Sequence, residues 1–201
     1  MIVWRELPQH KRAARSVIRD ARRSRVDRHD ADGRRLDGER LAQALADHLV
    51  RREGRPGVLA AYVALPTEPP TEALIEQATG LGWRVILPEM LPDKDLTWVA
   101  HDDRGVDLGT QAIADALVLV IPALAIDRHG MRLGQGGGSY DRALARRSPG
   151  AWTVAVVHDD ELAERVPCEP HDLPVDAVLT PSHGLLDLPR GQEVQRRSGV
   201  T

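Results

Sequence analysis

The chain has 201 residues, a formal net charge of −3 and one cysteine, which is enough sequence for one sizeable domain with its own core. The charge excludes a protein that binds nucleic acid through overall positive charge, although it permits a local basic patch. The single cysteine excludes a disulfide framework and a cysteine-based zinc site. The start of the sequence has no apolar run of signal-peptide length, and the longest apolar stretch, residues 116–126, is too short to span a membrane. We therefore expect a soluble, cytoplasmic protein.

Two helices are predicted in the first quarter of the chain. They span roughly residues 8–25 and 36–52, and leucines recur at every fourth position between residues 41 and 49. Residues 1–55 carry 15 basic and 9 acidic side chains. Such a surplus of basic residues usually forms a solvated helix face. The alternative is a positively charged surface that binds an anionic ligand.

After this basic region the sequence alternates between apolar strands and helices. Predicted strands cover residues 58–65, 83–88, 96–100, 116–121, 152–157 and 175–180, and predicted helices cover residues 71–80 and 139–147. Continuously apolar strands separated by helices are typical of a largely parallel sheet that is covered on both faces. We therefore expect one α/β domain over residues 1–201, a three-layer Rossmann-like sandwich with a helical N-terminal segment. Residues 182–201 are polar and are expected to form a flexible tail.

A glycine-rich loop lies between a predicted strand and a predicted helix. Residues 121–147 read IPALAIDRHGMRLGQGGGSYDRALARR and hold five glycines within nine positions. Glycines let backbone N–H groups wrap around an oxyanion, and ligands of parallel sheets bind at the carboxyl ends of strands. The loop is neither a Walker loop, since no Gly-Lys-Ser/Thr closes it, nor a dinucleotide fingerprint. It is either a phosphate-binding loop or a plain flexible turn.

Charged residues beside this loop favour the phosphate interpretation. Arg132 and Arg142 flank it and suit phosphate oxygens. Asp141 lies in the first turn of the predicted helix, where an acid is favoured by the helix dipole. Its functional alternative is an oxygen ligand for Mg²⁺ beside bound phosphates.

The order Ile-Asp-x-x-Gly-x-Arg-Leu-Gly-x-Gly-x-Gly-x-Tyr-Asp-Arg at residues 126–142 resembles the signature of the 5-formyltetrahydrofolate cyclo-ligase family, also called methenyltetrahydrofolate synthetases. Three further segments agree with that family in order and separation, and the resemblance covers about residues 8–181. These segments are the basic run at residues 11–15, the loop at residues 64–71 and the stretch at residues 166–180.

The resemblance implies a NagB/RpiA/CoA-transferase-like fold and a definite reaction. This reaction is the ATP-dependent cyclisation of 5-formyltetrahydrofolate to 5,10-methenyltetrahydrofolate, with release of ADP and phosphate, through phosphorylation of the formyl oxygen. It also implies Mg²⁺ as a cofactor and reduced folate and ATP as small-molecule partners. No membrane or nucleic-acid partner is expected, and the chain is expected to be a monomer.

The resemblance also implies roles for individual residues. Arg132 and Tyr140 are expected to be catalytic, Glu68 is expected to contact the amino group and ring N–H of the pterin edge, and Asp141 and Asp172 are expected to bind Mg²⁺. The expected ATP-binding residues are Lys11, Arg15, Arg132, Leu133, Gly134, Gln135, Gly136, Gly137, Gly138, Ser139 and Tyr140. The expected substrate-binding residues are Glu68, Gly136, Gly138 and Tyr140.

Each of these roles has a plainer alternative. Lys11 and Arg15 would be two solvated cations, Glu68 an acid that favours a nearby helix start, and Asp172 a turn former. The sequence departs from the family at Ser139 and Ile126, where aromatic residues are usual.

Three functions of other kinds stay open. One is an ATP-dependent ligase or kinase for another small carboxylated substrate, and the second is a non-catalytic regulator that binds nucleotide or folate. The third is an RNA-binding module formed by residues 1–55. Apart from Trp4, no aromatic ring lies among the arginines of this region, which weakens this alternative.

Overall fold

A seven-stranded sheet forms the centre of the computed structural model, which describes residues 2–26, 30–52, 56–103, 105–169 and 172–189. The strand order is β10-β9-β7-β4-β1-β2-β3. The strands are β1 (Val58–Ala60), β2 (Arg84–Met90), β3 (Leu96–Ala100), β4 (Ala116–Pro122), β7 (Trp152–Val156), β9 (Ala177–Thr180) and β10 (Gly184–Asp187). The inner strands from β9 to β2 are all parallel, and β3 and β10 run antiparallel at the two edges. This topology confirms the predicted mostly parallel sheet.

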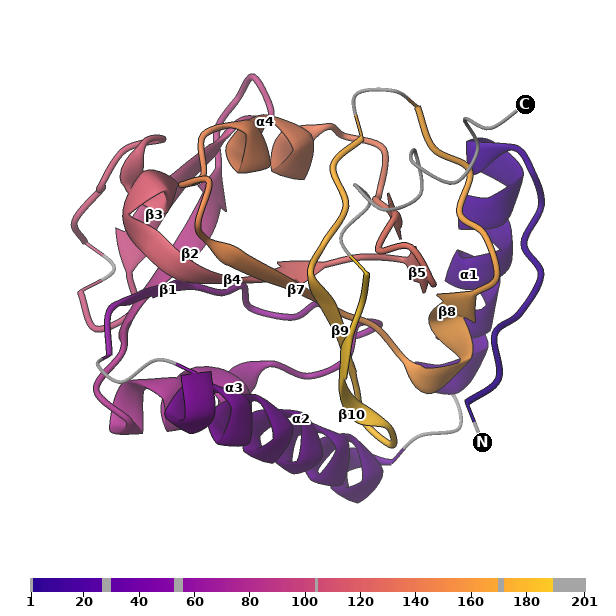
Figure 1. Ribbon diagram of the computed structural model, residues 1–201, viewed down its shortest axis with the longest axis horizontal. Coiled ribbons are helices and arrows are strands. Elements are labelled where there is room, and N and C mark those ends of the chain that lie inside the picture. The colour runs from indigo at the N-terminus through magenta and orange to yellow at the C-terminus, as the bar shows by residue number, and fades with distance from the viewer. Residues whose placement is uncertain (1, 27–29, 53–55, 104, 170–171, 190–201) are drawn as a thin grey trace, which may run out of the picture.

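Helices cover both faces of this sheet. They are α2 (Ala31–Arg52) and α3 (Glu72–Gly80) below it, and α4 (Ser139–Ala145) above it in the view of Figure 1. Two short 3₁₀ turns, η1 (Ala112–Asp115) and η2 (Asp159–Glu161), lie in connections. One buried cluster, which includes Leu41 and Trp152, packs between the sheet and α2–α3, and a second, which includes Trp98 and Leu144, packs on the α4 side. The three-layer prediction is therefore confirmed.

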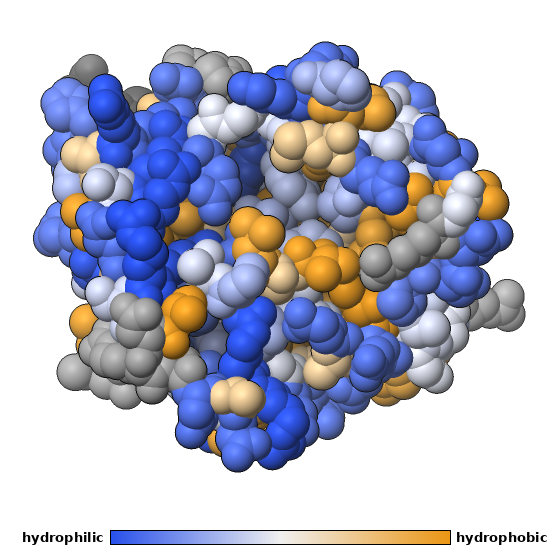
Figure 2. All heavy atoms as spheres, turned by 180° about the vertical axis from the view of Figure 1, so that it is seen from behind, coloured by the Kyte–Doolittle hydropathy of each residue, from blue (hydrophilic) through white to orange (hydrophobic). Residues whose placement is uncertain are grey.

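The N-terminal helix packs on a second sheet that the sequence did not reveal. This sheet has the order β6-β5-β8, with β5 (Ala125–Asp127), β6 (Arg132–Leu133) and β8 (Leu162–Ala163). Helix α1 (Lys11–Val26) buries Ala14 and Ile18 against it. Hydrophilic side chains gather over the side of the molecule where α1 lies (Figure 2). The small sheet therefore positions the basic helix α1 beside the segment that follows β4.

Several predicted segments differ in the structure. Helix α2 begins at residue 31, five residues before the predicted start. The strand predicted over residues 58–65 ends at residue 60, because the chain turns into a loop that Thr71 closes: its Oγ1 donates to the Tyr62 carbonyl at 2.6 Å and accepts from Ala64 N–H at 3.1 Å. The flexible tail predicted from residue 182 is wrong for β10, which pairs with β9. Residues 190–201 lie outside the described residues. Within the described part of the chain, no helix is both long and apolar enough to cross a membrane.

Candidate active site

The glycine-rich loop at residues 134–138 connects β6 to α4, and its backbone shape requires glycine at two positions. Gly136 has φ +99° and Gly138 has φ +72°, a region that side-chain-bearing residues rarely adopt. A Cβ atom on Gly136 would also lie 3.3 Å from the guanidinium carbon of Arg15. The glycines therefore permit both the turn and the close approach of an arginine from α1.

One face of α1 is fastened to this loop by arginines. The Nε of Arg15 donates to the Gly134 carbonyl at 2.9 Å, and Nη2 of Arg19 donates to the Gln135 carbonyl at 2.8 Å. Lys11 lies four residues before Arg15, so it shares this face. The sequence did not single out Arg19, although the same four-residue spacing was the signal that could have found it.

Arg132 is the most enclosed cation of the site. Only 4% of its side-chain surface is exposed, Nη1 donates to the Leu173 carbonyl at 2.7 Å, and Nη2 pairs with Asp141. Burial lowers the pKa of Arg132, and the nearby carboxylates of Asp141 and Asp172 oppose that shift. The guanidinium keeps its charge at neutral pH because the ordinary pKa of an arginine lies far above neutral pH.

Asp141 and Asp172, which are distant in the sequence, are both neighbours of Arg132, and each carboxylate is paired. Asp141 pairs with Arg132, and Asp172 accepts from Lys11 Nζ at 2.8 Å and from Glu169 N–H at 2.7 Å. No group of three or more acidic, histidine or cysteine side chains suited to a metal occurs among the described residues. The two acids thus fit Mg²⁺ only where phosphate oxygens and water complete its six ligands.

Glu68 and Tyr140 lie near each other at the end of the sheet, although they come from different elements. Glu68, in the loop after β1, is 4% exposed, and its Oε2 accepts from Leu65 N–H at 3.0 Å. Burial, with a further contribution from the charge of Glu68, raises the pKa of Tyr140, which therefore keeps its proton. Burial and the same carboxylate raise the pKa of Tyr62, whose buried hydroxyl has no hydrogen-bond partner among the described residues. Nothing in the sequence distinguished Tyr62.

The remaining predicted residues have mixed positions. Leu133 packs its side chain into the core beneath α1, so only its backbone is available to a ligand. Gln135 is held by Arg19 through both its carbonyl and its side chain. Ser139 begins α4 and is half-buried, and its Oγ would lie 3.6 Å from a Cβ on Gly137.

Comparisons with known proteins agree on one family. Residues 8–181 match the sequence model of the 5-formyltetrahydrofolate cyclo-ligase family. A 5-formyltetrahydrofolate cyclo-ligase of Mycolicibacterium smegmatis is 38% identical over 146 residues, which are 64% of this chain and 75% of that protein. One from Escherichia coli is 33% identical over 141 residues, which are 62% of this chain and 78% of that protein.

Solved structures show the same fold. A 5,10-methenyltetrahydrofolate synthetase from Mycoplasma pneumoniae superposes with a TM-score of 0.67 at 16% identity, over 82% of this chain and 96% of that one. A 5,10-methenyltetrahydrofolate synthetase from Aquifex aeolicus gives a TM-score of 0.64 at 21% identity, over 89% of this chain and 94% of that one.

Proposed function

Because the chain belongs to the 5-formyltetrahydrofolate cyclo-ligase family, we propose that the glycine-rich loop with the α1 face binds ATP and that the Glu68 loop binds the folate. The protein is a ligase, and its reaction is the ATP-dependent cyclisation of 5-formyltetrahydrofolate to 5,10-methenyltetrahydrofolate. The observation that carries the assignment of residues is that Arg15 of α1 bonds to the glycine-rich loop, while Arg132 pairs with Asp141 in the helix that follows the loop.

The chemistry explains why such a site needs several cations. The formyl carbon is amide-like, and its oxygen is a poor leaving group. Transfer of the γ-phosphoryl group to that oxygen releases ADP and makes the oxygen part of a phosphate. Attack of folate nitrogen 10 on the carbon then closes the ring as the carbon–oxygen bond breaks and phosphate leaves. Catalysis of this kind depends mainly on positioning and on charge stabilisation.

The cations of the site match these demands. Arg15 bonds to the glycine-rich loop, and Lys11, one turn earlier on α1, pairs with Asp172, so both can balance the charge of the triphosphate. Arg132 is held rigidly by the Leu173 carbonyl and Asp141, so its charge is already in place when the phosphoryl group moves. Asp141 and Asp172 would hold Mg²⁺ together with ATP oxygens, and the ion would neutralise phosphate charge.

The folate side has one acceptor and one donor. The Glu68 carboxylate suits the pterin edge, where an amino group and a ring N–H lie side by side. Tyr140 keeps its proton because burial raises the pKa of its phenol, so it can donate to the substrate. We further propose that the enzyme acts in the cytoplasm as a monomer on these two small molecules, without a membrane or nucleic-acid partner.

Replacing Lys11 or Arg15 with alanine is expected to raise the KM for ATP about tenfold, since each change removes a charged hydrogen-bond donor. The KM for folate should change much less. If both side chains bind one anion, the double variant should fall short of the product of the two single effects. The measurement is an ATP titration at saturating folate, with Arg12→Ala, an exposed position on the same helix, as the control. An unchanged KM for ATP in both single variants and in the double variant would show that Lys11 and Arg15 only form a solvated helix face.

Asp141→Asn is expected to raise the Mg²⁺ concentration for half-maximal activity about tenfold, because a neutral amide is a weaker ligand for a hard cation. Asparagine keeps the size of the side chain, so the helix start should persist. The control is Asp95→Asn, since Asp95 pairs at 2.7 Å with Arg146, the residue directly after α4, and belongs to no proposed metal set. Equal Mg²⁺ dependence of Asp141→Asn and the wild type would refute the metal role.

A further inference from the structure

The buried guanidinium of Arg22 lies next to the carboxylate of Glu68, the residue proposed to bind folate. Arg22, near the C-terminal end of α1, is 2% exposed. Its Nε and Nη2 donate to the two carboxylate oxygens of Glu161 at 2.7 and 2.9 Å, and Nη2 also donates to the Ala123 carbonyl at 2.6 Å. The third nitrogen, Nη1, makes no hydrogen bond with a described residue and lies 3.8 Å from Glu68 Oε1. Two nitrogens thus anchor the fork, and the third is aimed at Glu68.

Glu161 serves as the anchor of this arrangement. It is fully buried, and besides Arg22 it accepts from the His158 backbone N–H at 2.9 Å. Burial raises the pKa of Glu161, whereas Arg22 lowers it. A carboxylate with no exposed surface cannot contact a substrate, so its contribution is to hold Arg22.

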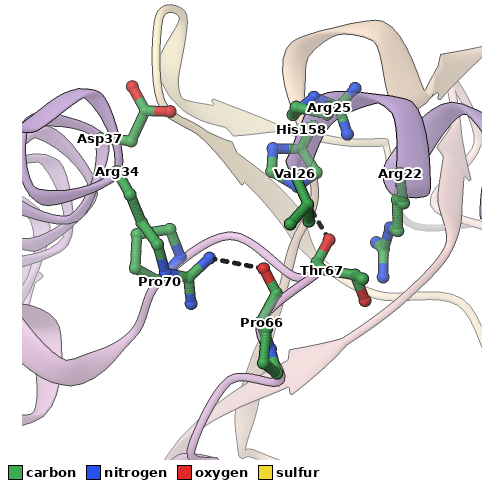
Figure 3. A pocket seen from close by; sticks show the side chains of 9 residues that line it. All are labelled: Arg22, Arg25, Val26, Arg34, Asp37, Pro66, Thr67, Pro70 and His158. Atoms are coloured by element: carbon green, nitrogen blue, oxygen red, sulfur yellow. Dashed lines mark hydrogen bonds between the residues drawn. The ribbon is translucent and has the colours of Figure 1, made fainter. Parts of the chain in front are cut away.

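Glu68 needs a positive charge because it is buried. Its loop is fixed from the other side by Arg34, whose Nη1 donates to the carbonyls of Pro66 at 3.1 Å and of Glu68 at 2.7 Å. Figure 3 shows Arg34 and Arg22 on opposite sides of this loop. In the described part of the chain, Arg22 is the cation that lies within 4 Å of the Glu68 carboxylate.

The neighbouring histidine does not supply the positive charge beside Glu68. A cavity of about 60 Å³ beside the loop is lined by Arg22, Arg25 and His158, among others (Figure 3), and it has room for water. Burial, reinforced by the charge of Arg25, lowers the pKa of His158 to about 3, so that imidazole is neutral at physiological pH. His158 therefore adds no positive charge near Glu68.

We propose that Arg22 is a positioning residue for folate recognition, which Glu161 anchors and which holds the Glu68 carboxylate in its orientation toward the pterin edge. A carboxylate held in one orientation can present its two acceptor oxygens to two neighbouring N–H groups. The proposal rests on the assignment of Glu68 to the folate. It adds a residue that acts through Glu68 without touching the substrate.

The test removes the charge of Arg22 without leaving Glu161 alone. Arg22→Gln combined with Glu161→Gln replaces a buried ion pair by two amides that can still bond to each other, so the fold should survive. We expect the KM for folate to rise about tenfold while the KM for ATP stays within about twofold. A purely structural role would not separate the two KM values. Arg25→Gln is the matched control, because Arg25 lines the same cavity and contacts Glu161 but not Glu68.

Glu68→Gln completes a double-mutant cycle. It should raise the folate KM by itself, and adding it to the Arg22/Glu161 double variant should cause little further change, since both act through one carboxylate. A folded double variant with a wild-type folate KM would overturn the role of Arg22. An unchanged folate KM in Glu68→Gln alone would instead overturn the assignment of Glu68, so the two failures are distinguishable.

A second variant covers the case in which the double variant does not fold. Arg22→Lys keeps the charge, but one ammonium group cannot reproduce the fork that reaches both Glu161 and Glu68. We expect its folate KM to rise a few-fold with the ATP KM unchanged. A folate KM equal to that of the wild type would contradict the proposal.

Discussion

Arg132→Gln is expected to reduce kcat by about 10²- to 10³-fold in a protein that remains folded, which is the usual cost of losing one preorganised group that stabilises transition-state charge. Glutamine retains a donor for the Leu173 carbonyl but carries no charge toward the phosphoryl group. The measurement is kcat at saturating ATP and folate, together with a thermal melting curve.

The control for this variant is Arg128→Gln on the same side of the molecule. Arg128 is exposed, pairs with Glu164 at 2.7 Å and lies over the Trp4 ring. Its loss should leave kcat unchanged. A folded Arg132→Gln protein that keeps more than about half of the wild-type kcat would show that Arg132 only braces Leu173 and Asp141.

Gly130→Ala is expected to lower the free energy of unfolding by about 3 kcal/mol. Gly130 has φ +79°, and a Cβ atom there would lie 2.4 Å from the Val175 carbonyl oxygen. The two backbones are joined by a hydrogen bond from Val175 N–H to the Gly130 carbonyl at 2.9 Å. Alanine must therefore adopt a strained conformation and also push two backbone segments apart.

Urea denaturation measures this effect, with Gly150→Ala as the control. A Cβ on Gly150 would meet no atom within 4 Å, so its free energy of unfolding should change by less than about 0.5 kcal/mol. A loss below about 1 kcal/mol for Gly130→Ala would contradict the close approach that holds the segment after Asp172 beside β5 and β6.

The central sheet was predictable because parallel strands buried on both faces leave long apolar runs in the sequence. Strand β3 was predicted with its observed limits, Leu96–Ala100. The small sheet was not, because β6 and β8 are two residues long and too short to show a period. Strand β10 was missed for a related reason, since at an exposed edge its residues are only partly buried.

The candidate site divides in the same way. A local motif predicted the loop and the residues around it, because the glycines and their neighbours are contiguous in the chain. The pairing of Lys11 with Asp172 and of Arg22 with Glu161 could not be predicted, since each joins segments more than 100 residues apart. Arg22 lies four residues after Ile18 on the buried face of α1. This spacing could have predicted that Arg22 is buried, although it is one of many basic residues in the helix.

The most direct measurement of the central claim follows the absorbance of 5,10-methenyltetrahydrofolate after the purified protein is mixed with 5-formyltetrahydrofolate, Mg²⁺ and ATP. The account predicts that product accumulates only when ATP is present and that one ADP is released for each methenyl group formed. Product formation that does not depend on ATP, or ADP release without methenyl product, would contradict it.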